Sequence, residues 1–148
     1  MITFFVPGRP VPQGSPKIIQ RKDGRASLAN DPKLKAWRSF GAVIARNAVR
    51  HSDHYEYAER RGKTCVFDEP ILVGVDYYLE RPKKPRFEAP AAMPDLDKLL
   101  RALGDMLSVN AGIIWDDAMI VGWDAQKRWA DEENPAGTYV WIERSELR

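Results

Sequence analysis

The sequence predicts an α+β fold, with a mixed or mainly antiparallel sheet packed against two main helices. Short β-prone runs bounded by turn residues lie at 2–6, 71–79 and 118–128. Apolar residues recur at helical spacing in two longer segments, 32–49 and 94–107. At 148 residues and 44% apolar composition the chain is long enough for one core. We therefore expect a single domain over residues 1–148, because strands and helices in this order favour the α+β class.

The first half of the chain should form a strand, a loop and a helix. "ITFFV" at 2–6 is a strand ended by a proline and a glycine, and the basic, Gly/Pro-rich segment that follows is mostly loop, with a hairpin around "KDGR". Asn30 or Asp31 can cap the helix 32–49, with Pro32 in its first turn. Its apolar stripe is Leu34, Trp37, Phe40 or Gly41, Ile44 and Ala48.

The second half begins with a polar stretch, 51–69, which lacks a sustained period and which we interpret as a long connection rather than a domain boundary. The strand 71–79 follows, and a proline-containing loop leads to the helix 94–107. One apolar stripe marks that helix: Leu96, Leu99, Leu100, Leu103, Met106 and Leu107. Gly112 can end or follow the helix, and a strand around 118–128 and "TYVWIER" complete the sheet.

Composition limits the class of protein more than it identifies it. A net charge of +2 does not by itself indicate a polyanion partner, but basic and acidic residues are segregated along the chain. The lone Cys65 excludes an intramolecular disulfide and a four-cysteine zinc site. No apolar run is long enough to span a bilayer and no leader is evident at the N-terminus, so we expect a cytoplasmic protein.

Acidic residues gather around the helix 94–107. Asp97, Arg101 and Asp105 are spaced i, i+4, i+8 and should share one polar face, with Asp95 at the start of the helix. Asp116 and Asp117 come just before the next strand, where at most one of them should face the same cleft. Carboxylates from two neighbouring elements suit a hard divalent cation such as Mg²⁺, with Mn²⁺ as an alternative. The pattern indicates metal-assisted phosphodiester hydrolysis.

Each of these residues also has an ordinary structural explanation. Asp95 can serve as an N-cap, and the negative charge of Asp97 can interact favourably with the positive end of the helix dipole. Arg101 can form an ion pair with an aspartate one turn away. Asp116 and Asp117 can form a solvated turn. The metal-site interpretation is favoured because all these groups should meet across one short connection, with basic loops on both sides.

The segments "PDLDKLLRALGDML" and "AGIIWDDAMIV" resemble the signature of the RusA family of Holliday-junction resolvases. The resemblance implies a homodimeric, Mg²⁺-dependent endonuclease that makes paired, symmetric incisions in four-way DNA junctions. It places metal ligands at Asp95, Asp97 and Asp117, with Asp116 next in line. Asp105 matches a common acidic position of the family, and we interpret it as a structural residue.

Two positions depart from the family signature. The catalytic lysine of the family falls on Arg101, which keeps the positive charge but cannot donate a proton at ordinary pH. The asparagine of the family falls on Lys98, which could supply a positive group one helical turn earlier. Arg101 or Lys98 could therefore still stabilise the charge of the transition state. Whether either residue acts as a general acid stays open.

Two basic loops are candidates for DNA contact because lysines and arginines in flexible loops can follow a phosphate backbone. The predicted DNA-binding residues are Arg9, Lys17, Arg21, Lys22 and Arg25 in the first loop, and Arg81, Lys83, Lys84 and Arg86 in the second. Trp115, next to the aspartate pair, is a candidate for substrate contact, whereas Trp37, Trp123 and Trp141 should serve packing. His51 and His54 lack further soft ligands and should be solvated.

Two other functions remain open at this stage. The changes at Lys98 and Arg101 also suit a protein that binds DNA junctions without cutting them. A metal-dependent nuclease of flaps, other branched DNA or RNA would use the same acidic groups. The sequence fits a bacterial or a phage-encoded protein equally well.

Overall fold

The core of the computed structural model is a four-stranded sheet. Its strand order is β1 (Ile2–Pro7), β8 (Gly137–Arg144), β6 (Ile71–Leu79) and β7 (Ile120–Trp129). β1 and β6 are antiparallel to β8, whereas β6 and β7 are parallel. The structure describes residues 1–15, 17–29 and 31–147, leaving out the side chains of 17–19 and 26–29. The mixed sheet and the helices confirm the predicted α+β class.

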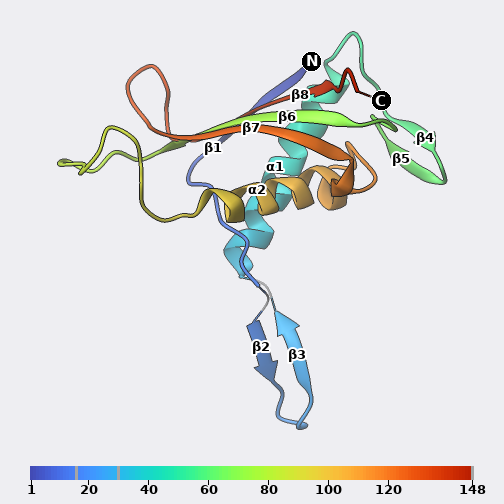
Figure 1. Cartoon of the computed structure of the whole chain (residues 1–148). Helices are drawn as coiled ribbons and strands as arrows, with labels where there is room; N and C mark the ends of the chain where they lie inside the picture. The colour runs from blue at the N-terminus through green and yellow to red at the C-terminus, as the bar shows by residue number, and fades with distance from the viewer. Residues whose placement is uncertain (16, 30, 148) are drawn as a thin grey trace.

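Both helices, α1 (Pro32–Arg50) and α2 (Leu96–Asp105), lie on the same side of the sheet (Figure 1). Alternate residues of the central strands face them and are buried, among them Val73, Val75 and Tyr77 of β6. The alternation follows from strand geometry, in which successive side chains point to opposite faces. The helices and this inner face of the sheet form the core that positions the acidic residues.

Helix α1 begins and ends close to the predicted bounds. The Asp31 side chain accepts a hydrogen bond of 2.9 Å from the backbone N–H of Lys33, and Pro32 opens the first turn. The alternative cap, Asn30, lies outside the described residues. Of the two alternatives for the apolar stripe, Gly41 is buried and Phe40 is 46% exposed. A Cβ at Gly41 would lie 2.8 Å from Met106 Cε, so the glycine allows the close approach of the two segments.

Helix α2 is shorter than predicted, because a π-helical turn, Met106–Asn110, replaces the end of the expected α-helix. The Ala111 N–H donates to the Met106 carbonyl at 2.7 Å, which is the i→i+5 bond of a π-turn. The predicted apolar stripe is nevertheless buried or partly buried along its whole length. A π-turn accommodates an extra residue, and Gly112 then leaves it with a φ of 62°.

Two small hairpins extend from this body. The first pairs β2 (Lys17–Gln20) with β3 (Ala26–Ala29), confirms the hairpin predicted around "KDGR", and projects away from the helices (Figure 1). The second pairs β4 (Ala58–Arg60) with β5 (Lys63–Cys65) and lies within the segment 51–69, which was predicted only as a long connection. Strands this short carry too few residues to show an alternating pattern. In the described residues no helix is long and apolar enough to cross a membrane.

The aspartate pair precedes a short helical turn rather than the strand itself. Asp117–Met119 form a 3₁₀ turn, and β7 begins at Ile120, two residues later than predicted. Asp116 caps this turn through a 2.8 Å hydrogen bond from the Ala118 N–H to its carboxylate. The turn changes the direction in which Asp117 leaves the backbone, and so determines which part of α2 it meets.

Candidate metal centre and nucleic-acid interface

Asp95 occupies the N-cap position of α2, as predicted, but its side chain does not serve the cap. Within the part of the chain that the structure describes, its carboxylate accepts no capping hydrogen bond. Lys98 Nζ lies 3.4 Å from Asp95 Oδ2, and both side chains are about half exposed, at 48% and 50%. An N-cap aspartate normally stabilises its helix by accepting such a bond. The ordinary structural explanation therefore does not account for this carboxylate.

Asp97 and Arg101 are both exposed and lie one helical turn apart. The segment before them is tied to β7, because Lys127 Nζ donates to the carbonyls of Ala92 at 2.7 Å and Pro94 at 3.0 Å. The start of α2 is thus fixed against the edge strand of the sheet. Asp95, Lys98, Asp97 and Arg101 together present two carboxylates and two cations to solvent at one end of the helix.

Asp117 lies at the other end of α2. A Cβ built on Gly104 would lie 3.6 Å from Asp117 Cβ, so the aspartate packs directly against the helix backbone. The pKa of Asp117 is raised above its usual value, first because neighbouring atoms displace water from the carboxylate, then because Asp105 and Asp116 repel its charge. A hydrogen bond with Asp116 acts in the same direction. Ionising Asp117 is therefore less favourable than for an aspartate free in solution.

The structure does not bring Asp95, Asp97 and Asp117 together within one chain. Asp97 and Gly104, which Asp117 contacts, are seven residues apart, and a rise of about 1.5 Å per residue separates them by roughly 10 Å. Oxygens that share one Mg²⁺ lie within roughly 4 Å of each other. Among the described residues no group of three or more metal-binding side chains forms a site. The prediction that these carboxylates converge is corrected: α2 holds them at opposite ends.

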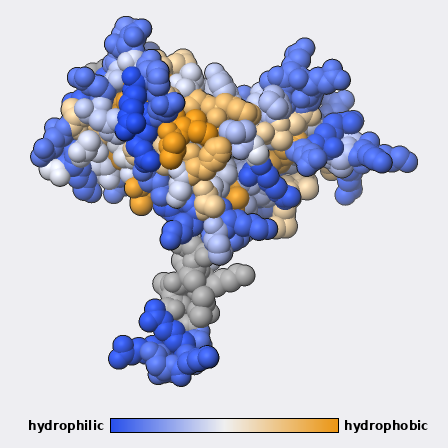
Figure 2. Space-filling view, turned by 180° about the vertical axis from the view of Figure 1, so that it is seen from behind, coloured by the Kyte–Doolittle hydropathy of each residue, from blue (hydrophilic) through white to orange (hydrophobic). Residues whose placement is uncertain are grey.

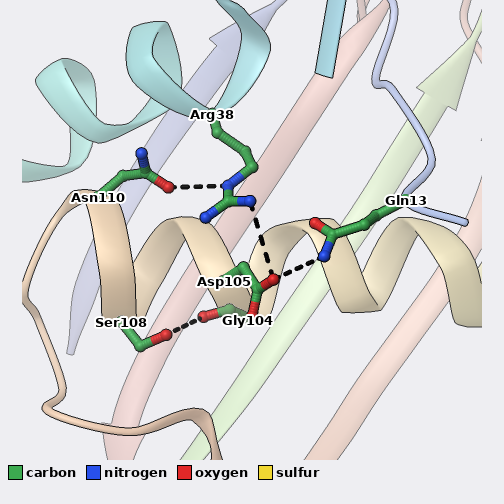
Figure 3. Close-up of polar contacts among 6 residues, drawn as sticks. All are labelled: Gln13, Arg38, Gly104, Asp105, Ser108 and Asn110. Carbon is green, nitrogen blue, oxygen red and sulfur yellow. Dashed lines mark hydrogen bonds and ion pairs between the residues drawn. The ribbon is translucent and has the colours of Figure 1, made fainter. Parts of the chain in front are cut away.

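Asp105 is held by residues from two distant segments (Figure 3). Gln13 Nε2 donates to Asp105 Oδ2 at 2.6 Å, and Arg38 Nη1 of α1 lies 3.8 Å from the same oxygen. The Arg38 Nε–H also donates to Asn110 Oδ1 at 2.8 Å, which connects α1 to the π-turn. Buried hydrogen bonds to charged groups are the stronger ones. The contacts agree with a structural role for Asp105, and they also fix the end of α2 against which Asp117 packs.

A hollow of about 330 Å³ lies beside this end of the helix. It combines three carboxylates with one cation and one large aromatic side chain: Asp105, Asp116, Asp117, Lys63 and Trp115. Trp115 Nε1 donates to Asp68 Oδ1 at 3.1 Å, so its polar edge is already engaged. Neither Lys63 nor Asp68 stands out in the sequence, because both belong to the segment 51–69, where no periodic pattern marks them.

Arg9 of the first basic loop meets the second basic loop near the start of α2. Arg9 lines the same groove of about 1070 Å³ as Arg81 and Lys83, and Pro94 forms part of its wall. A second groove of about 1030 Å³ carries the remaining cations of that loop, Lys84 and Arg86. The structure thus brings Arg9 to the 81–86 loop, beside the helix end that carries Asp95.

The other predicted DNA-binding residues lie on the β2–β3 hairpin. Arg21, Lys22 and Arg25 are exposed at its tip, which is coloured as hydrophilic at the bottom of Figure 2. The side chain of Lys17 lies outside the described residues. His51 and His54 are exposed, with His51 Nδ1 at 2.9 Å from the Asn47 carbonyl at the end of α1.

Comparison with known proteins gives one family. The family model of the endodeoxyribonuclease RusA matches residues 7–143, and so includes all of α2, β6 and β7, all of β8 but its last residue, and only the last residue of β1. No curated protein matches the sequence significantly. The matched region covers nearly the whole chain, and the exposed aspartates at the start of α2 lie inside it. The chain therefore belongs to the RusA family of endodeoxyribonucleases, nucleases that act on Holliday junctions.

Proposed function

We propose that this protein is a divalent-metal-dependent endodeoxyribonuclease that resolves four-way DNA junctions by paired, symmetric phosphodiester hydrolysis. The observation that carries the proposal is the start of α2, where Asp95 does not cap its own helix and Asp97 is exposed beside it, inside the region that matches the RusA family. Mg²⁺ is the proposed cofactor, with Mn²⁺ as a substitute, because both accept carboxylate oxygens and water as ligands.

The acidic residues fit a divalent cation in chemistry. Asp95 and Asp97 present exposed carboxylates, and Asp117 has a raised pKa beside two further carboxylates, a repulsion that a bound cation would relieve. We propose Asp95, Asp97 and Asp117 as metal ligands and Asp116 as a further one. The cation would supply a nucleophilic water and offset the charge of the scissile phosphate.

The residues around the carboxylates would hold the substrate. Lys98 and Arg101 lie within two turns of Asp95 and would stabilise the charge that develops on the phosphate. Arg101 does so as a fixed cation, since a guanidinium stays protonated at ordinary pH. Arg9, Arg81 and Lys83 would direct a DNA strand along their shared groove toward Asp95, and Lys84 and Arg86 would contact it from the second groove.

The protein would act as a homodimer. Two symmetric cuts in a four-way junction require two equivalent centres, and a two-fold dimer supplies one in each chain. Because one chain holds Asp97 and Asp117 at opposite ends of α2, a cation shared by both would need Asp117 from the second chain. The dimer would then serve both the pairing of the cuts and the assembly of each centre.

A panel of synthetic DNA substrates tests the choice of substrate. The protein is incubated in Mg²⁺ with four-way junctions, linear duplex, flaps and forks of the same sequence, and the products are resolved on denaturing gels. We expect paired nicks at symmetric positions in the junction and little cutting of the duplex. Equal cleavage of the duplex would contradict junction selectivity. Binding of the junction without nicks would favour a non-cleaving protein, the alternative that the changes at Lys98 and Arg101 support.

A further inference from the structure

We propose that the β4–β5 hairpin is a further DNA contact, in which Arg61 and Lys63 bind the phosphate backbone of the strand that passes the hollow of Asp116 and Asp117. The inference rests on the proposed function, because it assumes that the acidic residues meet DNA. It assigns a binding role to a segment outside the two basic loops. The partner is a DNA strand, recognised through its phosphates rather than its bases.

The hairpin is hydrogen-bonded to the segment that leads to the aspartate pair. The backbone N–H groups of Val66 and Phe67 both donate to the Ile113 carbonyl at 3.0 Å, so the end of β5 is fixed to the segment that leads to Asp116. A Cβ built on Gly112 would lie 3.4 Å from the Thr64 carbonyl oxygen, which shows how closely the two backbones approach. Whatever binds at Asp116 and Asp117 therefore meets the hairpin at a fixed position.

The side chains of Arg61 and Lys63 both lie near the Trp115 ring at the rim of the hollow. The Arg61 guanidinium and Lys63 Nζ each lie 5.9 Å from the centroid of the Trp115 ring. Asp68 contacts both Trp115 and Arg61. Its carboxylate accepts a hydrogen bond from Trp115 Nε1 and forms an ion pair with Arg61 Nε at 3.0 Å. Cation–π contacts and a shared carboxylate restrict where these long side chains can point. The cluster thus presents two positioned cations beside the carboxylates.

Charge explains why a DNA-cutting centre needs such a rim. Asp105, Asp116 and Asp117 line the hollow, and Lys63 is the cation among the residues that line it. A DNA phosphate approaching three carboxylates is repelled unless positive groups lie close to its path. The Arg61 side chain is 69% exposed even though it pairs with Asp68, so it remains accessible to a ligand.

The backbone at the tip of the hairpin is a second, independent observation. Arg61 has a φ of 52°, and Gly62 follows with a φ of 75°. The first central position of such a turn favours glycine or asparagine, since a longer side chain is strained there. A surface ion pair contributes too little to stability to explain an arginine at this position. Phosphate binding explains it, because the turn places the guanidinium on the rim.

The experiment measures how junction binding depends on salt. Dissociation constants of the four-way junction are determined from 50 to 200 mM salt, with Ca²⁺ replacing Mg²⁺ to limit cutting, for the wild type, Lys63→Gln and Arg61→Asn. Asparagine tolerates the left-handed backbone, so the turn is kept. The matched control is Arg144→Gln, which removes an exposed cation that, like Arg61, pairs with a carboxylate, here Glu69, and that lines neither groove of the basic loops.

For each lost phosphate contact, the slope of the logarithm of the association constant against the logarithm of salt concentration should become less steep by about 0.9. We expect this reduction in both hairpin variants and no change in Arg144→Gln. Trp115→Leu should weaken binding and reduce the slope, whereas Trp115→Phe, which keeps an aromatic face, should lose less. Unchanged slopes in Lys63→Gln and Arg61→Asn would overturn the proposal. A hairpin that serves stability alone would instead shift the unfolding midpoint and leave the slope at its wild-type value.

The outcome is distinguishable from failure of the proposed function. The same titrations are repeated with single-stranded and duplex DNA. If the wild type never cuts junctions but the hairpin variants still lower the salt dependence, the proposed function fails and the DNA contact stands. If junctions are cut normally and the slopes do not change, the contact fails alone. A wild type that binds none of these DNAs would overturn both.

Discussion

Asp117 shows at the level of a single residue how the site differs from an ordinary acidic surface. Its carboxylate loses water against Gly104 and faces repulsion from Asp105 and Asp116, so its pKa is raised. A group with a raised folded-state pKa binds protons more readily in the folded protein than in the unfolded one. Carboxyl groups in such settings are frequent at functional sites, where a ligand rather than the fold stabilises the charge.

Replacing Asp117 by asparagine should stabilise the metal-free protein at neutral pH. The folded state binds more protons at this position, so wild-type stability falls as pH rises through the raised pKa of Asp117. Asp117→Asn should remove this loss of stability, because asparagine does not ionise. Because the residue is exposed, we expect a gain of at most about 1 kcal/mol.

Urea unfolding in EDTA at pH 7 and at pH 3 provides the measurement. The difference between the variant and the wild type should disappear at pH 3, where the carboxyl is protonated in both the folded and the unfolded state. Adding Mg²⁺ should stabilise the wild type more than the variant, since a cation that binds only the folded state adds to its stability. A variant less stable than the wild type at pH 7 would show that the carboxylate is structural.

The sequence predicted the residues of the polar face well and their long-range partners poorly. Asp97, Arg101 and Asp105 share a face because a spacing of four residues is enough to place them there. The contacts of Gln13 and Arg38 with Asp105 join segments far apart in the chain, and no local pattern indicates them. The prediction that Asp95, Asp97 and Asp117 converge was wrong within one chain. It assumed that the start of α2 and the start of the next strand lie at one point, whereas Asp117 contacts the far end of α2.

At the level of elements, long periodic segments were predictable and short or irregular ones were not. Helix α1, helix α2 and strand β6 show clear apolar patterns and lie close to their predicted bounds. The π-turn Met106–Asn110 and the β4–β5 hairpin were not predicted. A π-turn depends on one extra residue and on contacts such as that of Arg46 Nη1 with the Asn110 carbonyl at 2.6 Å, which only the fold creates.

Alanine substitutions at two glycines of these elements should change the stability of the protein in opposite directions. A Cβ at Gly104 would make ordinary contacts with Asp117 Cβ at 3.6 Å and Ile120 Cδ1 at 3.8 Å, so Gly104→Ala should stabilise the protein by roughly 0.5–1 kcal/mol through helix propensity. A Cβ at Gly74 would overlap the Trp141 ring, at 1.8 Å from Cε2. Gly74→Ala should therefore destabilise the protein by roughly 1–3 kcal/mol.

Chemical denaturation compares the two variants with the wild type, and each serves as the control for the other. A destabilised Gly104→Ala would mean that Asp117 and Ile120 cannot accommodate a methyl group. The contact between α2 and the 3₁₀ turn would then be tighter than the structure indicates. An unchanged Gly74→Ala would show that Trp141 moves freely, in which case the outer face of the sheet is not packed at this point.

At the level of the whole molecule, α2 separates the carboxylates within one chain, and in the proposed dimer a second chain would reunite them. The proposed dimer predicts a particle of about twice the 16.9 kDa chain mass, measurable by sedimentation equilibrium. A sharper test mixes two inactive variants, Asp97→Asn and Asp117→Asn, after joint unfolding and refolding. If each centre takes Asp97 from one chain and Asp117 from the other, the mixed dimer regains one intact centre.

Such a mixture should nick one strand of the junction at a rate well above that of either variant alone. Nicking without paired cuts would therefore support a centre assembled from two chains. A mixture as inactive as its components, shown to contain mixed dimers by mass spectrometry, would place each centre within a single chain. The Asp97→Asn protein mixed with itself by the same protocol is the control for damage during refolding.

The central claim is that Asp95 and Asp97 at the start of α2 hold the divalent cation with which the protein cuts DNA junctions. The most direct test is cleavage of a synthetic four-way junction by the wild type and by Asp97→Asn, each in Mg²⁺ and in EDTA. We expect paired nicks from the wild type in Mg²⁺ alone, and a rate at least about 100-fold lower for Asp97→Asn with junction binding retained. Cleavage by Asp97→Asn at the wild-type rate, or by the wild type in EDTA, would contradict it.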